Sequence, residues 1–457
     1  MLTAAAWAAV CFFKIYQSSD PSGGDGYFYL KQTEWLAGHF EFYHADYSFI
    51  FFPLALIYEF TGSSLLAYQI VTSFSLFAMS ASLGLIFFHH SEFIRNKTVR
   101  ILVSCAFSLM LAQQTVLLKL SFEFAKNGLA QAFILIGLVY FFQKSFKHAS
   151  LFFFLAIITH KLAILIVGMG ILFLLIERIF KHERRKTFIF FFFGGFTLLG
   201  GAVFVIYPRL SRHFLNFFDH FAFEKNLFLD SPNQLISSSM IGLLFVWLAI
   251  SCVQFRKFKN PFAISLILFS LLPFFPFFSG YNIEIKYRLF LISFTFAAVL
   301  FSLAVSTIKQ KGIQVLMIVS SLALLSYEGG RYNGFPWIMN WSEKITHLNE
   351  LESHVSSTDE LVTHHSLQFY IDYKTKIRAR SMVSENRKPR FQIAFTPEFY
   401  HLNEGLSDEL RQIEIISLGS TYGLFEYEDF QNLMRVYPVL SNWRNQFQVR
   451  PDFVQDY

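Results

Sequence analysis

The sequence contains little charge, because Asp, Glu, Lys and Arg make up only 15% of its 457 residues. An ordinary soluble domain carries about 25%. With 54% hydrophobic residues and a mean hydropathy of +0.42, so few charges cannot keep the apolar surface in water. The same apolar and aromatic content excludes a disordered chain, which stays open only when its hydrophobicity is low. The class that remains is a protein with several membrane-spanning helices.

Cysteine is also scarce, and the common phosphate-binding and nucleophile motifs are missing. Cys11, Cys105 and Cys252 all lie in apolar runs, so the sequence predicts no disulfide framework. It has no Gly-rich phosphate loop, no Cys-x-x-Cys pair and no nucleophile elbow. Nothing in it therefore indicates a nucleotide-dependent enzyme.

The net charge of +6 is unevenly distributed. Residues 1–327 hold 25 Lys and Arg against 14 Asp and Glu, whereas residues 328–457 hold 13 against 18. The basic excess therefore belongs to the apolar part, where such residues set membrane topology. We expect no nucleic acid among the partners of this protein.

A spanning helix needs about 20 apolar residues, and fewer where the membrane is locally thin. Run 48–60 is short, carries Glu59 and begins with aromatic residues and Pro53, so we interpret it as an amphipathic helix in the membrane interface. We expect Gly62 to end this helix and Ser63 or Ser64 to cap the next one. The sequence predicts about eleven spans, at 2–16, 65–88, 101–117, 128–142, 149–160, 162–177, 187–207, 235–254, 261–279, 289–307 and 313–327.

Charge in the loops predicts the orientation of these spans. The five loops expected inside carry fifteen Lys and Arg against three acids, which satisfies the positive-inside rule. This orientation requires a break at Thr159-His160-Lys161, between two half-length helices, because one continuous helix there would place the following basic loop outside. We expect a multi-pass protein of the inner (plasma) membrane, with a cytoplasmic N-terminus and a tail outside. Residues 2–13 have no positive region before them and no cleavage site after them, so we interpret them as a signal anchor whose shortness indicates a start further upstream.

The tail differs from the rest of the chain. Tyr327-Glu328-Gly329-Gly330 opens a polar stretch, so we place a transmembrane domain at 1–327 and an extracytoplasmic domain at 328–457. The tail pattern predicts a small α/β domain. Its expected elements are strands at 361–363, 391–396 and 412–418 and a helix at 366–374.

Polar residues gather at the outer ends of the spans. The ten spans from residue 65 onward have no charge in their interiors, which disfavours an ion-coupled transporter. The first outer loop, 17–48, holds five acids against Lys31. There Gly23-Gly24 precedes Asp25, at the start of a helix expected to run to Gly38. Asp25 is either the N-cap of this helix or a base that takes a proton from an acceptor.

Five features in this order resemble the GT-C superfamily of membrane glycosyltransferases, and in layout the aminoarabinose transferases and protein O-mannosyltransferases. Together they cover roughly residues 1–307. They are Asp25 after the first span, Phe52-Pro53-Leu54 leading to Phe60-Thr61-Gly62, the segment Ser121–Lys126 with Glu123, the turn Thr159-His160-Lys161, and Lys286-Tyr287-Arg288. The family pattern has a second Pro before Pro53 and a Gly after Lys161, which this sequence lacks.

The resemblance implies an inverting transfer of sugar from a polyprenyl-phosphate donor to a glycan, lipid or protein acceptor at the outer face. Asp25 would be the base, and Glu123 would position the acceptor or a divalent metal. Lys161 and Arg288 would hold the phosphate. The other residues assigned to substrate binding are His160, Lys286, Tyr287, Tyr29 and Asp46. As alternatives, Arg288 is an interface anchor, and Glu123 pairs with Lys119 or Lys126.

Metal binding and other activities stay open at this stage. His39 and His44 with Asp46, and the pair His364-His365, have ligand chemistry, but a solvated loop histidine is the ordinary interpretation. The other enzymatic candidate is a polysaccharide (O-antigen) polymerase or ligase. The non-enzymatic candidate is a lipid-linked-sugar flippase or transporter, which inverted repeats would favour; we find none. A membrane scaffold leaves the acidic first loop unexplained.

Overall fold

A computed structural model shows a chain that divides into two compact units, neither of which is one continuous stretch. The first unit holds residues 1–9, 74–121 and 125–333, and the second holds 10–73, 122–124 and 334–457. The structure describes residues 2–22, 25–43, 46–164, 166–168, 170, 238–255, 261–271, 283–331, 348, 350–356, 359–363, 365–375, 377–380, 389–395, 416–418 and 422–436.

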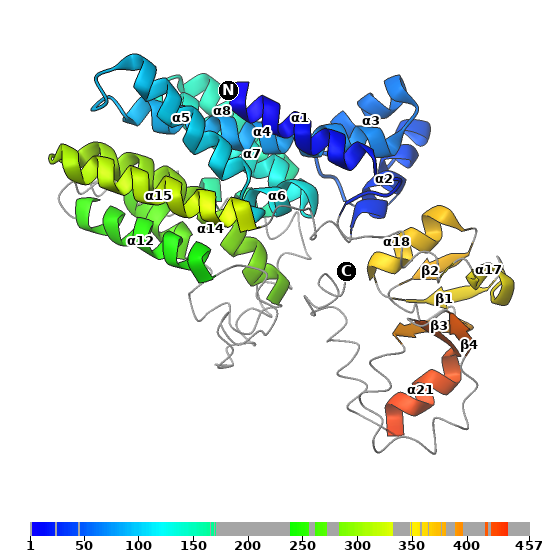
Figure 1. Cartoon of the computed structure of the whole chain (residues 1–457). Coiled ribbons are helices and arrows are strands. Elements are labelled where there is room, and N and C mark those ends of the chain that lie inside the picture. Colours follow the sequence, from blue (N-terminus) through cyan, green and yellow to red (C-terminus); the bar gives the residue numbers. More distant parts are fainter. Residues whose placement is uncertain are drawn as a thin grey trace, which may run out of the picture. The chain divides into compact units, whose positions relative to one another are not determined.

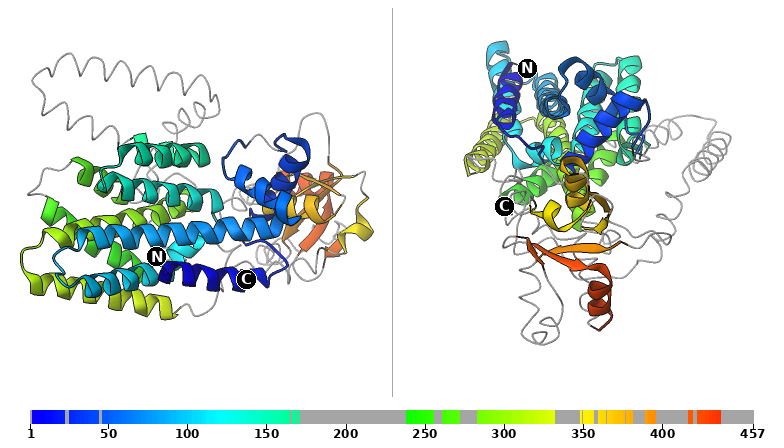
Figure 2. Two further views of the ribbon diagram at one scale, coloured as in Figure 1. Left: turned by 90° about the horizontal axis from the view of Figure 1, so that it is seen from above. Right: turned by 90° about the vertical axis from the view of Figure 1, so that its right-hand side faces the viewer.

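The first unit is built from helices (Figures 1 and 2). Within it α7 packs against α8, α12 and α13 pack against α14, and α15 packs against α5. Buried polar side chains link these helices, as when Gln131 of α7 donates to Thr295 of α14 at 2.6 Å. The helices that lie wholly or partly in this unit are α1 (Leu2–Tyr16), α4 (Ser64–His90), α5 (Lys97–Ala112), α6 (Thr115–Phe122), α7 (Ala125–Phe142), α8 (Phe146–Thr159), α12 (Ser238–Phe255), α13 (Pro261–Leu271), α14 (Ile283–Thr307) and α15 (Lys311–Arg331). Residues 10–16 of α1, 64–73 of α4 and Phe122 of α6 belong to the second unit.

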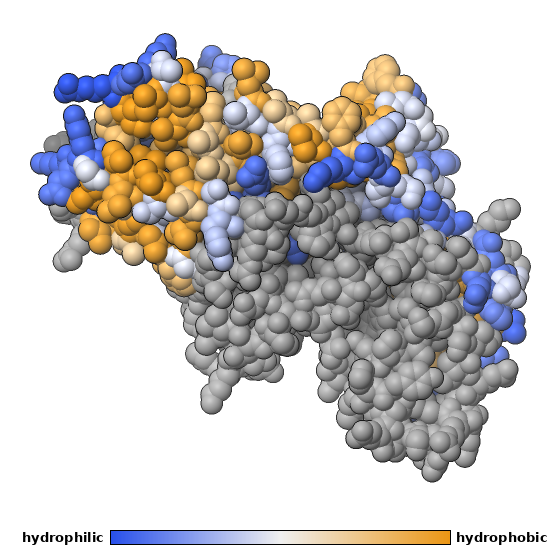
Figure 3. All heavy atoms as spheres, viewed as in Figure 1, coloured by the Kyte–Doolittle hydropathy of each residue, from blue (hydrophilic) through white to orange (hydrophobic). Residues whose placement is uncertain are grey.

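The outer faces of these helices are apolar. Leu102 of α5 and Leu316 of α15 are exposed by 63% and 65%. Figure 3 shows hydrophobic side chains gathered over α5 and α15. An apolar surface this extensive needs an apolar solvent, and helices satisfy their own backbone within it. The first unit is therefore that of a helical membrane protein.

Three described helices are long and apolar enough to cross a membrane, at Ser64–His90, Ala125–Phe142 and Arg288–Thr307. The pair α5 and α6 makes a fourth if counted as one bent span, and α1, α3, α8, α12 and α15 contain shorter apolar helices. The predicted span 101–117 was wrong in form, because the chain bends by 61° after Ala112 and continues as α6 to Phe122. The count of eleven stays a prediction, and span 187–207 lies outside the described residues.

The predicted break between two half-helices is present. α8 ends at Thr159, and His160 has an extended backbone with φ −150° and ψ 134°. The backbone is helical again from Lys161, and Leu162 N donates to His160 Nδ1 at 3.1 Å. His160 thus ends one helix and caps the next.

The second unit contains the two helices between the first and second expected spans, α2 (Gly26–His39) and α3 (Phe51–Thr61). Gly62 ends α3 with φ +65°, a left-handed conformation that favours glycine. Ser63 Oγ then accepts a hydrogen bond from Leu66 N at 3.2 Å and so caps α4. These ends agree with the sequence prediction. The interfacial position of α3 stays a prediction.

The tail contributes a five-stranded sheet in the order β2-β1-β3-β5-β4. β1 runs parallel to β2 and β3, while β5 runs antiparallel to β3 and β4. α18 connects β1 to β2, as the crossover between parallel strands requires. The tail elements are α17 (Leu351–His354), β1 (Glu360–Val362), α18 (His365–Lys374), β2 (Arg378–Arg380), β3 (Phe391–Phe395), β4 (Ile416–Leu418), β5 (Tyr422–Glu426) and α21 (Tyr427–Val436).

The helix before the tail is longer than the sequence indicated. α15 continues through Gly329-Gly330 to Arg331, so the polar change at Tyr327 does not end it. Two glycines lower helix propensity by about 1 kcal/mol each, and here the helix persists in spite of them. The predicted domain boundary at 327 therefore falls inside a helix, and the assignment of the tail as a separate domain stays a prediction.

Topology gives the first testable expectation. A reporter that is active only in the cytoplasm, fused after Arg331, should stay silent, because the sequence predicts a cytoplasmic N-terminus followed by an odd number of spans. The same reporter fused at Lys144, in the connection between α7 and α8 that we expect on the inner side, is the positive control. Strong activity of the Arg331 fusion would contradict the predicted number and orientation of the spans.

Candidate functional site

Asp25 begins α2 without capping it through its side chain. Its backbone has φ −90° and ψ 4°, and its carboxylate makes no cap hydrogen bond. Its carbonyl oxygen accepts from Tyr29 N at 3.2 Å, whereas its carboxylate takes part in no hydrogen bond or ion pair among the described residues, and the residue is half-buried. An Asp at this position ordinarily accepts from the N–H groups of the first turn. The capping role is therefore not realised, and the carboxylate oxygens remain available to a ligand.

A tyrosine and a serine join the Asp25 loop to the segment that carries Glu123. The Tyr68 hydroxyl of α4 lies 2.9 Å from Ser22 O and 2.8 Å from Phe122 O. Ser22 Oγ also donates to Phe122 O at 2.8 Å, across 100 residues of sequence. These buried contacts hold two segments that are distant in sequence, at Ser22 and at Phe122, against the Tyr68 side chain.

This junction brings the two predicted carboxylates to the same tyrosine. Asp25 follows Ser22 by three residues, and Glu123 follows Phe122 directly and is 8% exposed. The charges of both carboxylates act on the Tyr68 phenol. Two carboxylates of different burial near one point can divide the tasks of accepting a proton and positioning a substrate.

Tyr68→Phe should destabilise the second unit by about 1–3 kcal/mol, the cost of leaving a buried polar group unsatisfied. Phe122 O keeps its bond from Ser22, whereas Ser22 O loses the only partner described for it. Thermal unfolding of the purified protein measures the change. Equal stability of the variant and the wild type would contradict the role of Tyr68 as the junction of the two loops.

Asp20 has a structural role that the sequence did not reveal. Its carboxylate accepts hydrogen bonds from the Tyr27 hydroxyl and from Ser19 Oγ, the latter at 3.1 Å. Burial, together with the Asp20 carboxylate, raises the pKa of Tyr27 above its ordinary value, so this phenol remains a donor. Because both Asp20 oxygens are occupied, Asp25 is the better candidate for a base.

The predicted cations gather around His160 within the first unit. The charges of Lys126, Arg288 and Lys161 all act on the His160 imidazole. Lys161 is exposed at the start of a helix, and Arg288 is half-buried on α14. Lys126 in the first turn of α7 was not among the predicted ligands, although it belongs to the quoted segment Ser121–Lys126. Several cations in one place suit an anionic group such as a phosphate.

Other predicted site residues have different surroundings. Tyr29 is 2% exposed, with its ring packed 5.7 Å from Phe51 and 5.4 Å from Tyr68. Asp46 is half-buried. Lys286 and Tyr287 lie in the helical backbone of α14, and the structure does not describe their side chains. The contacts predicted for these four residues with substrate stay predictions.

The histidine candidates for a metal site do not form one in the described residues. The His39 ring stacks on Trp35 at 3.9 Å. His44 and His364 lie outside the described residues, as does the side chain of His365. Among the residues that the structure describes, no three His, Cys, Asp or Glu side chains are arranged to hold a metal ion.

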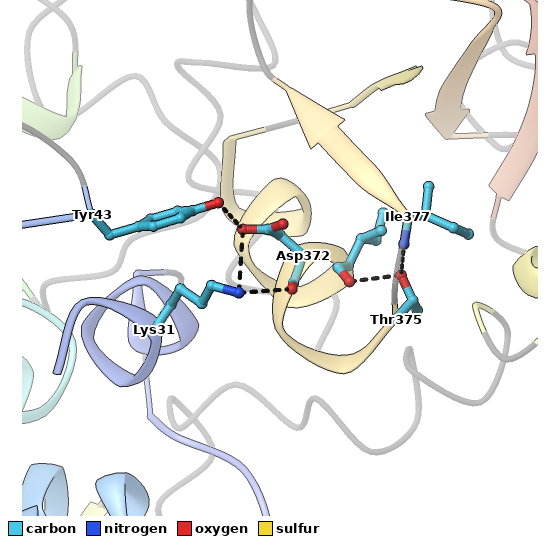
Figure 4. A network of polar contacts seen from close by, with 6 residues as sticks. Lys31, Tyr43, Asp372, Thr375 and Ile377 are labelled. Atoms are coloured by element: carbon cyan, nitrogen blue, oxygen red, sulfur yellow. Dashed lines mark hydrogen bonds and ion pairs between the residues drawn. The ribbon is translucent and has the colours of Figure 1, made fainter. Parts of the chain in front are cut away.

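A polar network between α2 and α18 was missed by the sequence analysis (Figure 4). Asp372 of α18 accepts a hydrogen bond from Tyr43 at 2.8 Å and pairs with Lys31 of α2 at 3.9 Å. Nearby, the Tyr373 hydroxyl donates to Glu34 of α2 at 2.7 Å. Burial and an accepting carboxylate raise the pKa of Tyr43 and of Tyr373 to about 12.

These two phenols make alkaline stability testable. Their pKa is higher in the folded state than the ordinary value of 10, so the folded chain binds their protons more tightly. Their contribution to the free energy of unfolding is complete below pH 10 and is lost as the pH rises to about 12. Unfolding midpoints from pH 9 to 12 measure it. The double variant Tyr43→Phe, Tyr373→Phe should show a weaker fall, and an unchanged slope would contradict the assignment.

Comparison with known proteins adds a likeness of fold. No family model and no curated protein matches the sequence. Among solved structures, the chain is similar to an oligosaccharyltransferase of Archaeoglobus fulgidus, a GT-C superfamily member crystallised with a tethered acceptor peptide that contains the NVT sequon. The TM-score is 0.49 at 8% identity, over 83% of this chain and 63% of that chain, so this chain spans less than two thirds of it. A likeness at this level assigns no residue role and no substrate.

Proposed function

We propose that this protein is a membrane glycosyltransferase of the GT-C kind, which moves a sugar from a polyprenyl-phosphate carrier to an acceptor at the outer face of the membrane. The observation that carries the proposal is the junction at Tyr68. It brings two carboxylates to the Tyr68 side chain in a chain of apolar helices. One is that of Asp25, which makes no cap hydrogen bond, and the other is that of buried Glu123.

The proposed reaction is a single displacement at the anomeric carbon. The acceptor oxygen forms a bond to this carbon while the bond from the carbon to the carrier phosphate oxygen breaks. The proton of the acceptor goes to the Asp25 carboxylate, and the bonding electron pair leaves with the phosphate. Attack from the face opposite the leaving group inverts the anomeric configuration. A phosphate leaves without a strong general acid, so one carboxylate base suffices, and Glu123 positions the acceptor.

The cations have a separate task in this proposal. Lys161 and Arg288, with His160 beside them, bind the phosphate as negative charge grows on it, which favours the transition state over the ground state. Since the carrier chain stays in the bilayer, the partners are a lipid-linked sugar and a glycan, lipid or protein acceptor. The plasma membrane and an outward-facing site belong to the same proposal.

A panel of radiolabelled polyprenyl-phosphate sugars, incubated with the purified protein in lipid nanodiscs, tests this function. Transfer of label to an acceptor by the wild type, and its loss in Asp25→Asn, is the expected result. Growth of long glycan products from a preformed lipid-linked glycan would favour a polymerase or ligase. Movement of the lipid-linked sugar between leaflets without cleavage would favour a flippase and contradict the proposal.

A further inference from the structure

The tail helix α18 packs along the helix that begins with Asp25, and aromatic rings form this contact. Tyr27 of α2 lies 5.1 Å from Tyr370 and 5.6 Å from Tyr373, and Phe28 lies 4.8 Å from Phe369, all measured between ring centroids. Tyr27 and Phe28 are in the first turn of α2. The views in Figure 2 show α18 beside α2. The turn that follows Asp25 is therefore packed against the tail.

Charged and polar contacts extend this packing beyond the first turn. Lys31 Nζ lies 3.9 Å from Asp372 Oδ2 and 3.4 Å from the Asp372 carbonyl oxygen in the last turn of α18, where a positive charge is favourable (Figure 4). Tyr43, in the segment after α2, donates to the same carboxylate. The Lys31 and Asp372 side chains are 26% and 21% exposed, so water screens this pair less than a pair on the open surface.

A second polar contact ties α18 to the start of α4. Glu34 Oε1 accepts hydrogen bonds from Tyr373 at 2.7 Å and from Ser64 Oγ at 2.6 Å. Glu34 thus links α2 at once to the tail and to the helix that carries Tyr68. Contacts with both α18 and α4 therefore fix the orientation of α2.

α18 is itself held by the sheet. Thr375 Oγ1 donates to Ile371 O at 2.7 Å and accepts from Ile377 N at 3.2 Å, which closes the last turn of α18 (Figure 4). β2 follows at Arg378 and pairs with β1. The helix therefore connects two paired parallel strands and is anchored at both ends, which makes it a firm support for α2.

We propose that α18 is the positioning element for Asp25, with Asp372 and Tyr373 as positioning residues that act through α2. The tail thereby sets the rate of the transfer without touching the reacting atoms. This inference rests on the proposed function, in which Asp25 is the base. Misplacing a reacting group by about 1 Å costs about 10² in rate, so a support for α2 has a large effect on turnover.

A charge exchange across Lys31 and Asp372 tests the inference. Asp372→Lys places two cations together and should lower kcat on the order of 10- to 100-fold. KM for the lipid-linked donor should change less than about twofold, because the proposed phosphate ligands are not on α2 or α18. The double variant Lys31→Asp, Asp372→Lys restores an opposite pair and should recover most of the rate. Asn432→Lys, which introduces the same side chain at exposed Asn432 on α21, is the control and should leave kcat unchanged.

Hydrogen exchange of the α2 amides separates this inference from the proposed function, because it needs no activity. Protection of residues 26–39 should fall in Asp372→Lys and in Tyr373→Phe, return in the double variant, and stay unchanged in Asn432→Lys and in Tyr427→Phe. If the wild type transfers no sugar from any donor tested, the proposed function fails and the exchange result still decides whether α18 supports α2. Unchanged protection in Asp372→Lys, or lost protection with an unchanged kcat, would overturn the inference. A double variant that stays as slow as Asp372→Lys would also overturn it.

Discussion

Asp25→Asn is expected to abolish sugar transfer while the protein folds as the wild type does. Removal of a general base lowers the rate by about 10²- to 10⁴-fold. The carboxylate makes no cap hydrogen bond, and Asn is an equally good N-cap residue, so the helix loses nothing. The rate of label transfer and the thermal unfolding midpoint, measured on one preparation, give the two readouts.

Asp20→Asn is the matched control, because it makes the same change five positions earlier in the same loop. Its amide cannot accept both hydrogen bonds that the Asp20 carboxylate accepts from Tyr27 and Ser19. We expect a loss of about 1–3 kcal/mol in stability and a smaller loss of rate. Full activity of Asp25→Asn, or a greater loss of rate in Asp20→Asn, would show that Asp25 is not the base.

The second large effect is expected at the cations around His160. Lys161→Ala and Arg288→Ala should each reduce the rate by about 10²–10³, the cost of losing one charge-stabilising donor. The loss should appear chiefly in kcat, because negative charge on the phosphate increases as the sugar leaves. Steady-state kinetics with a single lipid-linked donor separate this effect from weaker binding.

Lys161→Arg tests whether charge alone is sufficient. The guanidinium is a planar fork and the ammonium a compact point charge, so we expect partial activity between that of Ala and the wild type. Lys144→Ala, at a lysine in a loop expected on the inner side, is the control and should retain full activity. If Lys161→Ala and Arg288→Ala both keep the wild-type kcat, the phosphate site lies elsewhere.

Local signals in the sequence predicted the end of α3 and the start of α4. Gly62 supplies a left-handed residue and Ser63 a capping oxygen, and both act within a few positions in the chain. The break at His160 was predicted because one continuous helix over 149–177 would have placed the most basic loop on the outer side. Strand β1 and helix α18 were found from their apolar patterns. β2 was missed because Arg-Ala-Arg has no such pattern, and β5 because a glycine interrupts it.

Contacts between distant segments could not be predicted. Whether Asp20 or Asp25 is occupied depends on where the Tyr27 hydroxyl points, which no spacing reveals. Glu123 is brought to Tyr68 by a carbonyl oxygen, a group that every residue has. The pair between Lys31 of α2 and Asp372 of α18 joins residues more than 300 positions apart. The bend between α5 and α6 lies at Gln113 and Gln114, which read as ordinary polar residues within an apolar run.

The cap formed by His160 also fixes where its ring carries a proton. Nδ1 accepts from Leu162 N, so this nitrogen has no hydrogen and the neutral imidazole carries its proton on Nε2. In this tautomer the ring can offer one N–H to an anion but has no free lone pair with which to take a proton. His160 is thus suited to be a neutral hydrogen-bond donor among the charged Lys126, Lys161 and Arg288, and not a second base.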